Sequence, residues 1–402
     1  MSTTVDGGAP VPFLDVTAPG FGFGTPEVAE AQAENWYADS PVGLLVLRYA
    51  EGHALLRDQR LDHNGKRFME MNGVTGGPIH DWFVPMIMNH DGAHHRRLRG
   101  LVGKAFTPRM IAGLRPFVRT RAEKLAGDLA VAGECEFIED FANPLPLAVM
   151  SEMLGVPPED HDVFHTWTTD VGLVFSIALG GDVVARVEAA LVGLGEYIDA
   201  LMERKKAVPE ADLISALVAA QQDDPEISPA ELRNLIITTV FAAHDTTRHQ
   251  LANAMVAFAG HPDQWELLGR RPELADRAVD EVMRWLPSSP TIYRFAAQDF
   301  EYQGLDIAKD TFLTVCVTAA QRDPRVFRDG GRFDITAVRE APLLQFGAGP
   351  HHCLGIALAK AELAEALPAL ATRLGPPSVA GAFTWRPPIG IHGPNSLPLR
   401  FG

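Results

Sequence analysis

The sequence predicts a mainly α-helical fold with small β-sheets, organised as one domain over residues 1–402. Most of the segment 108–373 shows the spacing of apolar residues that is typical of helices. Alternating or β-branched segments are few and lie at 43–49, 312–317 and 382–401. No internal repeat, low-complexity tract or flexible linker divides the 402 residues into separate units.

The composition indicates a folded globular protein, since hydrophobic residues make up 47% of the chain and charged residues 21%. A formal net charge of -16 disfavours nucleic acid and anionic membrane as partners, because both repel an acidic protein. Residues 1–8 lack the basic start and apolar stretch of a secretory signal, and the apolar run 171–181 is too short to span a bilayer. Three scattered cysteines are too few for a disulfide framework. We therefore expect a cytoplasmic protein.

One predicted helix is unusually long. Ser228 is a capping residue, Pro229 occupies the first helical position, and Glu231 completes a capping box. The helical pattern continues to Gly260, which gives roughly thirty residues and about 45 Å of helix. Its middle, 236–243, is apolar or small on nearly all sides, so we expect a buried helix.

The polar run 244–249 follows the apolar middle of this helix directly and includes Asp245 and Thr246. A buried carboxylate is costly unless it is paired, so these residues must be satisfied or used. Thr246 can donate a hydrogen bond to the carbonyl of Ala242 and so open the helix locally. From this segment alone, a functional pair and a helix that merely emerges into solvent at His244 both remain open.

A second segment, 346–355, places Cys353 just before a predicted helix at 356–374. The helix dipole and the free N–H groups there favour a thiolate, which is the form that binds metal. Gly347 and Gly349 allow a tight loop whose backbone approaches a large ligand. A lone cysteine is usually a small buried hydrophobe, but this setting favours a metal ligand.

Two other ligands fit this segment less well. A zinc site needs about four ligands, and no second cysteine lies near Cys353. A dinucleotide-binding loop starting at Gly347 requires glycine at position 352, where His352 stands. A thiolate as the one strong ligand in a glycine-rich loop suits haem iron.

A third feature is the pair Glu281 and Arg284, which lies on one face of a predicted helix. By itself the pair is weak evidence, because most such pairs are surface salt bridges.

Together these segments resemble the cytochrome P450 family, and the match runs in order over nearly the whole chain. The family's haem-binding motif F-x-x-G-x-H-x-C-x-G is filled by Phe346, Gly349, His351, Cys353 and Gly355. The resemblance implies a single prism-shaped domain that binds haem b, with Cys353 as the axial ligand of the iron.

The resemblance also implies roles for the other segments. Glu281 and Arg284 match the family's E-x-x-R pair, whose third member, a later arginine, maps to Arg332. The segment 242–247 resembles the oxygen-activation motif, in which Thr246 hydrogen-bonds dioxygen and Asp245 supplies protons as catalytic residues. The implied haem contacts are His95, Arg99, Ala243, Arg294, Phe346, Gly349, His351, Cys353 and Gly355, although Ala243 replaces the usual glycine. The implied substrate contacts are Trp82, Phe83, Met86, Ala242, Pro290, Thr291 and Ile391.

The implied reaction inserts one oxygen atom from O2 into a small hydrophobic organic substrate. Electrons are expected from a separate ferredoxin and ferredoxin reductase, since no module for either is present in the 402 residues. The basic stretch 95–109 is then either a solvated helix face or the ferredoxin docking surface. Two alternatives remain: a radical-coupling or peroxide-using member of the family, and a non-catalytic haem-binding sensor.

Overall fold

The structure is a computed structural model that describes residues 11–175, 181–224 and 226–402. Two segments used in the sequence analysis lie outside the described residues. They are 1–8, which lacks the features of a secretory signal, and 176–180, which belong to the short apolar run 171–181. Within the described part, no helix combines the length and the apolar character needed to cross a bilayer.

The predicted fold class is confirmed, because 57% of the structure is helical and its sheets are small. The α-helices are α1 (Pro26–Glu34), α2 (Tyr49–Leu55), α3 (Gly65–Met71), α4 (Pro78–Phe83), α5 (Gly92–Ala105), α6 (Pro108–Ala132), α7 (Pro144–Leu154), α8 (His161–Gly172), α9 (Gly181–Ala207), α10 (Leu213–Gln222), α11 (Pro229–Ala259), α12 (Pro262–Arg270), α13 (Ala275–Trp285), α14 (Val317–Ala320) and α15 (Ile356–Ala371). The strands are β1 (Tyr37–Ser40), β2 (Gly43–Val46), β3 (Leu61–Asp62), β4 (Glu134–Glu136), β5 (Thr291–Ala296), β6 (Phe300–Tyr302), β7 (Leu305–Ile307), β8 (Phe312–Cys316), β9 (Pro377–Val379) and β10 (Pro398–Phe401).

The strands form one larger sheet and two small ones. The larger sheet has the order β1-β2-β8-β5-β3, with β2 and β8 parallel and the other neighbours antiparallel. Two of the three predicted strand segments are found as β2 and β8. The tail 382–401 is extended only at β10, because most of it forms loops that are interrupted by prolines.

The long helix α11 begins and ends where the sequence predicts. The Ser228 hydroxyl accepts a hydrogen bond from the Glu231 N–H at 3.2 Å, and the Glu231 carboxylate accepts one from the Ser228 N–H at 2.8 Å. The helix runs for 31 residues and is followed by Gly260. His244 and Asp245 are fully buried, so the hypothesis that the helix emerges into solvent at His244 is wrong.

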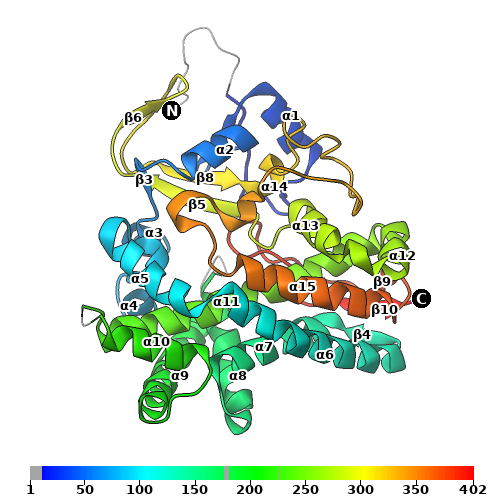
Figure 1. Ribbon diagram of the computed structural model, residues 1–402. Helices are drawn as coiled ribbons and strands as arrows, with labels where there is room; N and C mark the ends of the chain where they lie inside the picture. Colours follow the sequence, from blue (N-terminus) through cyan, green and yellow to red (C-terminus); the bar gives the residue numbers. More distant parts are fainter. Residues whose placement is uncertain (1–10, 176–180, 225) are drawn as a thin grey trace.

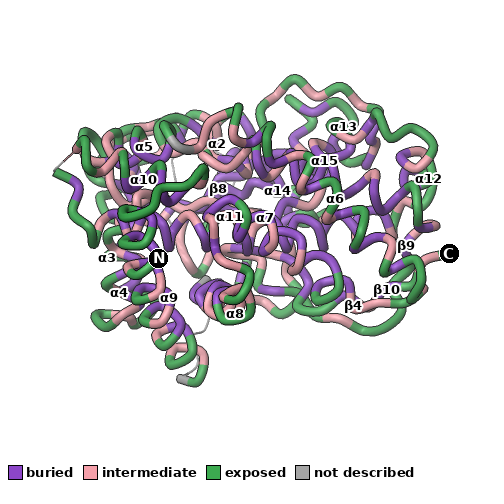
Figure 2. Tube along the Cα trace, turned by 60° about the horizontal axis from the view of Figure 1, so that its bottom comes forward, coloured by how far each residue is buried: buried purple, intermediate pink, exposed green. Residues whose placement is uncertain are grey.

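The largest apolar core surrounds α11 and extends to α6, α7, α9, α13 and α15. In Figure 1, α15 crosses the middle of the molecule with α11 behind it, and the larger sheet lies with α1 and α2 to one side. Figure 2 shows buried residues gathered in the interior and exposed residues along the outer turns. Helices α11 and α15 thus form the two walls between which a deep site can lie.

A buried ion cluster on α13 corrects one expectation. Glu281 and Arg284 form two hydrogen bonds, both at 2.8 Å, and the third arginine is Arg339, whose Nη2 lies 3.2 Å from Glu281 Oε1. Arg332 contributes only its backbone carbonyl, which accepts from Arg284 at 2.9 Å. Its side chain is 72% exposed, because the loop turns here and the Asp334 N–H, not Arg332, reaches Glu281.

Candidate active site

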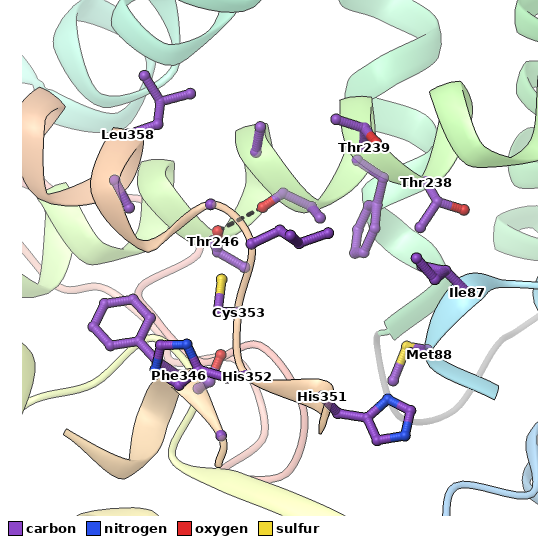
Figure 3. A pocket seen from close by; sticks show the side chains of 18 of the residues that line it. Ile87, Met88, Thr238, Thr239, Thr246, Phe346, His351, His352, Cys353 and Leu358 are labelled. Carbon is purple, nitrogen blue, oxygen red and sulfur yellow. Dashed lines mark hydrogen bonds between the residues drawn. The ribbon is translucent and has the colours of Figure 1, made fainter. Parts of the chain in front are cut away.

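A cavity of about 360 Å³ lies between α11, α5, α15 and the loop before α15. Its walls are mostly apolar, as is usual for a site that binds an organic ligand. Eleven of the expected catalytic, haem-contact and substrate residues line it: Met86, His95, Arg99, Ala242, Ala243, Thr246, Arg294, Phe346, His351, Cys353 and Gly355. Figure 3 shows the Cys353 sulfur directed toward the part of α11 that carries Thr246.

The loop that presents Cys353 is closed by its own backbone. The Cys353 N–H donates to the Phe346 carbonyl at 2.8 Å. Gly347 and Gly349 have φ values of 69° and 68°, which L side chains rarely adopt, so glycine is required for this path. Gly349 packs against Arg57 and, unlike Gly347, does not reach the described wall of the cavity. The loop therefore fixes the direction of the cysteine side chain.

Opposing influences act on the Cys353 thiol. Burial raises its pKa above the ordinary value, whereas the N–H groups of Gly355 and Ile356 and the guanidinium of Arg99 act in the opposite direction. Arg99 also donates to the His352 carbonyl and so supports the loop. A sulfur that faces the cavity, with N–H donors and a cation beside it, suits a metal-bound thiolate.

Arginine and histidine side chains gather at one end of the cavity. Arg294 Nη1 donates to His63 Nε2 at 2.6 Å, and the ring of His351 lies 4.6 Å from that of His63 and 4.3 Å from that of His95. Burial lowers the pKa of Arg294 to about 10 and that of His95 to about 4. His63 was missed in the sequence, because it lies far from the recognised motifs in an irregular segment.

This end of the cavity is short of hydrogen-bond acceptors. His351 contacts Asp91 at 2.9 Å, but His63 Nδ1 is buried and has no hydrogen-bond partner among the described residues. Since Nε2 accepts from Arg294, Nδ1 carries the ring proton and is a donor without an acceptor. A ligand with carboxylate groups would supply the missing negative charge.

Thr246 of α11 lies in the wall of the cavity opposite Cys353. Its hydroxyl donates to the Ala242 carbonyl at 2.7 Å, as predicted, and Figure 3 shows this bond at the edge of the cavity. Ala243 lies in the same wall. A hydroxyl group therefore lies beside Ala242 and Ala243 in the wall across from Cys353.

Asp245 points away from this opening and does not belong to the described wall. Its carboxylate contacts Arg248, and Arg386 Nη1 at 2.8 Å, with His249 at 3.6 Å. Burial alone raises the pKa of this carboxyl, but the nearby cations outweigh it and hold the pKa well below its usual range. Arg386 was missed because it is 141 residues distant in sequence.

The expected substrate residues are divided by the structure. Met86 and Ala242 line the cavity, whereas Phe83, Pro290, Thr291 and Ile391 lie outside its described wall. Trp82 lines a second cavity of about 420 Å³ between α4, α9 and α11. The centroid of its ring lies 5.9 Å from that of Phe241, which lines the first cavity. Wall residues that were not foreseen include Ile87, Met88, Thr238, Thr239, Ser288, Ser289 and Ile292.

Comparison with known proteins identifies the family. The model of the family described as "Cytochrome P450" matches residues 161–373. Luteothin monooxygenase of Streptomyces thioluteus is 47% identical over 395 residues, which are 98% of this chain and 97% of that protein. The chain belongs to the cytochrome P450 family.

Other P450s agree with this assignment. The 6-deoxyerythronolide B hydroxylase of Saccharopolyspora erythraea is 31% identical over 367 residues, covering 89% of each chain. The structure of cytochrome P450 CYP109Q5 from Chondromyces apiculatus superimposes with a TM-score of 0.86 at 29% identity, covering 97% of this chain and 98% of that one. The P450 fold, the haem b cofactor and the monooxygenase class are thereby established.

The cavity of this P450 fits haem b. Its donor set is one thiol opposite an open helix wall, with arginine and histidine side chains at one end, among them the unpartnered Nδ1 donor of His63. Elsewhere in residues 11–175, 181–224 and 226–402, no cluster of three or more His, Cys, Asp or Glu side chains is arranged to hold a metal ion. The chemistry of the site is therefore that of a haem-thiolate protein.

Proposed function

We propose that this P450 monooxygenase oxidises luteothin or a closely related small hydrophobic molecule. We also propose that residues 1–402 form one domain. The observation that carries the proposal is the apolar cavity in which Cys353 faces Thr246. The substrate class is supported by the 47% identity to luteothin monooxygenase over almost the full length of both chains.

In this proposal Cys353 would bind the haem iron, and the haem would supply the iron at which O2 is activated, helped by thiolate ligation. His63 would join the four predicted histidine and arginine residues in binding the haem carboxylates. Ala243, Phe346 and Gly355 line the cavity and would pack against the haem, with Gly349 shaping the loop. The five residues that would bind the carboxylates are His63, His95, Arg99, Arg294 and His351.

Thr246 and Asp245 have different tasks in proton delivery. Thr246 lines the cavity and can turn its hydroxyl from Ala242 toward the reacting oxygen. Asp245 is ionised and engaged by Arg248 and Arg386, so it passes protons only after it accepts one and releases Arg386. The implied exchange makes the Arg386 ion pair part of the relay.

Addition of luteothin to the oxidised haem-loaded protein should convert low-spin to high-spin haem, because an apolar ligand displaces water from the cavity. The reaction with isotopically labelled O2 should give a product that carries one labelled oxygen atom. An absent spin shift together with absent product would contradict the proposed substrate class.

The matched variant for this experiment is Thr246→Ala. It should bind luteothin as the wild type does, yet release more of the consumed electrons as peroxide, because the hydroxyl that helps deliver protons is lost. The measurement is product formed per reduced nicotinamide consumed, with peroxide assayed in parallel. Wild-type coupling in this variant would assign Thr246 a purely structural role.

We further propose that a ferredoxin, reduced by a ferredoxin reductase, docks on α5 and the start of α6. Arg96, Lys104 and Arg109 are exposed there, whereas Arg97 is paired with Glu226. Basic residues on a chain of net charge -16 would orient an acidic partner. A cytoplasmic location is proposed because all three cysteines are free, as in a reducing compartment.

The double variant Arg96→Glu with Lys104→Glu should slow reduction by ferredoxin and weaken its dependence on ionic strength, since it removes attractive charges. Arg270→Glu on α12 is the control, because this exposed residue lies on a distant helix. Equal reduction rates in the double variant and the wild type would show that α5 presents only a solvated face.

A further inference from the structure

Two neighbouring serines in the cavity wall have no role in the function described above. Ser288 and Ser289 follow α13 and line the cavity that contains Cys353 and Thr246. Neither serine hydroxyl has a hydrogen-bond partner among residues 11–175, 181–224 and 226–402. Most of the surrounding wall is apolar, and the few polar groups of such a cavity are usually those that orient its ligand.

The backbone of Ser288 is held in place from two sides. Its N–H donates to Gln250 Oε1 at 2.9 Å, and its carbonyl accepts from the His392 N–H at 2.9 Å. Gln250 Nε2 also donates to the Leu286 carbonyl at 3.0 Å, so one buried side chain of α11 holds both ends of the segment 286–288. The segment is therefore already ordered, which reduces the entropy that a ligand loses by binding to it.

Gln250 also relates the two serines to Thr246. It lies four residues after Thr246, so both side chains are on one face of α11, and both line the cavity. A ligand that binds the serine hydroxyls is thus held at a fixed position relative to Thr246.

The hydroxyls of two other wall residues are engaged, unlike those of the serines. Thr239 donates to the Leu235 carbonyl at 2.8 Å, and Thr238 donates to Asn234 Oδ1 at 3.3 Å. A hydroxyl without a partner becomes costly when a ligand excludes water from it, unless the ligand supplies an acceptor. The serines therefore favour a ligand with an oxygen atom at this place over a pure hydrocarbon.

We propose that the hydroxyls of Ser288 and Ser289 donate hydrogen bonds to an oxygen atom of the substrate and so decide which of its carbon atoms is oxidised. This inference rests on the proposed function and deepens it, because it makes the substrate an apolar molecule that carries a carbonyl or ether oxygen. Gln250 is a positioning residue, since it acts on the substrate through the backbone of Ser288.

The contact can be tested on the oxidised haem-loaded protein without turnover, with two probes of matched shape. Benzylacetone carries one carbonyl group, and butylbenzene has a methylene group at the same place. Calorimetry should show that Ser288→Ala combined with Ser289→Ala weakens the binding of benzylacetone on the order of tenfold, because hydrogen bonds to its oxygen are lost. Butylbenzene should bind the double variant at least as tightly as the wild type. Equal benzylacetone affinities in the two proteins, or no binding of benzylacetone to the wild type, would overturn the proposal.

Thr239→Val is the matched control, because it removes from the same wall a hydroxyl that is engaged with the Leu235 carbonyl. It should change the affinities for the two probes by the same factor. A loss confined to benzylacetone in this variant would contradict the assignment to the serines. The haem content of each variant shows that its fold is retained.

Gln250→Leu tests the positioning role. It keeps both serine hydroxyls but releases the Ser288 N–H, so the preference for benzylacetone over butylbenzene should fall toward that of the double serine variant. Adding Gln250→Leu to the double variant should not change this preference further, since both changes act on one contact. A purely structural role of Gln250 would weaken the binding of both probes equally, and that result would remove Gln250 from the proposal.

The orientation of the substrate is tested by the products of turnover. With luteothin, the double serine variant should have a higher KM and give products oxidised at more carbon atoms than the wild type, because the substrate is held less precisely. An unchanged KM and product pattern would overturn the orienting role. If the wild type does not oxidise luteothin, the proposed substrate fails, whereas the two probes, which need no turnover, still decide the serine contact.

Discussion

Cys353→Ala should abolish the strongly red-shifted Soret band that the reduced protein shows with carbon monoxide. The band requires a thiolate on the iron, and Cys353 is the one cysteine in the wall of the cavity. The other two, Cys135 and Cys316, have no place there: burial raises the pKa of Cys135 to about 12, and Cys316 is fully buried in the core beside the larger sheet. Monooxygenase activity should be lost together with the band.

Cys135→Ala is the matched control, because it removes a partly exposed thiol in the middle of strand β4, outside the wall of the cavity. It should keep the band, the spin shift and the activity. Retention of the red-shifted band in Cys353→Ala, or its loss in Cys135→Ala, would contradict the assignment of the axial ligand.

Arg284→Ala should destabilise the protein by about 3–5 kcal/mol, because it leaves the buried Glu281 carboxylate without its main partner. This is a large share of the stability of a typical folded protein. Arg284 is fully buried and also donates to the carbonyls of Gln321, Gly330 and Arg332, so three further hydrogen bonds are lost. Urea unfolding and the rate of haem loss measure the effect.

The comparison of Arg339→Ala with Arg332→Ala tests which arginine completes the cluster. Arg339→Ala should destabilise in the same direction as Arg284→Ala, whereas Arg332→Ala should stay within about 0.5 kcal/mol, because its side chain is exposed. The reverse order would contradict the structure.

The cluster also predicts a pH dependence. Burial raises the pKa of Glu281, but its hydrogen bonds and charge contacts with Arg284 and Arg339 lower it more, to a value below the ordinary 4.5. The stabilisation that ionised Glu281 contributes is therefore present above the ordinary value of 4.5 and is lost as the pH falls through the lowered pKa of Glu281.

Local sequence patterns predicted the elements that local physics determines. The capping residues of α11 and the glycines before Cys353 act over a few residues, so both the helix start and the loop were predicted correctly. The hydrogen bond from Thr246 to Ala242 also follows from helix geometry alone.

Contacts between distant segments could not be predicted in the same way. Arg332 and Arg339 lie in one irregular loop, where no periodicity tells which side chain turns inward. The expected substrate residues also depend on tertiary packing, since Met86 lines the cavity whereas Phe83, at the end of α4, does not. The pairing of Asp245 with Arg386 depends on the tertiary fold, because the two residues lie far apart in the sequence.

The ion pair between Asp245 and Arg386 also sets an order of events during synthesis. Arg386 follows Asp245 by 141 residues in the sequence, so it leaves the ribosome later. The delay is on the order of ten seconds at ordinary translation rates. Until then the carboxylate in the middle of α11 lacks one of the two guanidinium groups that neutralise it. The middle of α11 around Asp245 is thus among the last parts of the chain to mature, after the core helices around it have been made.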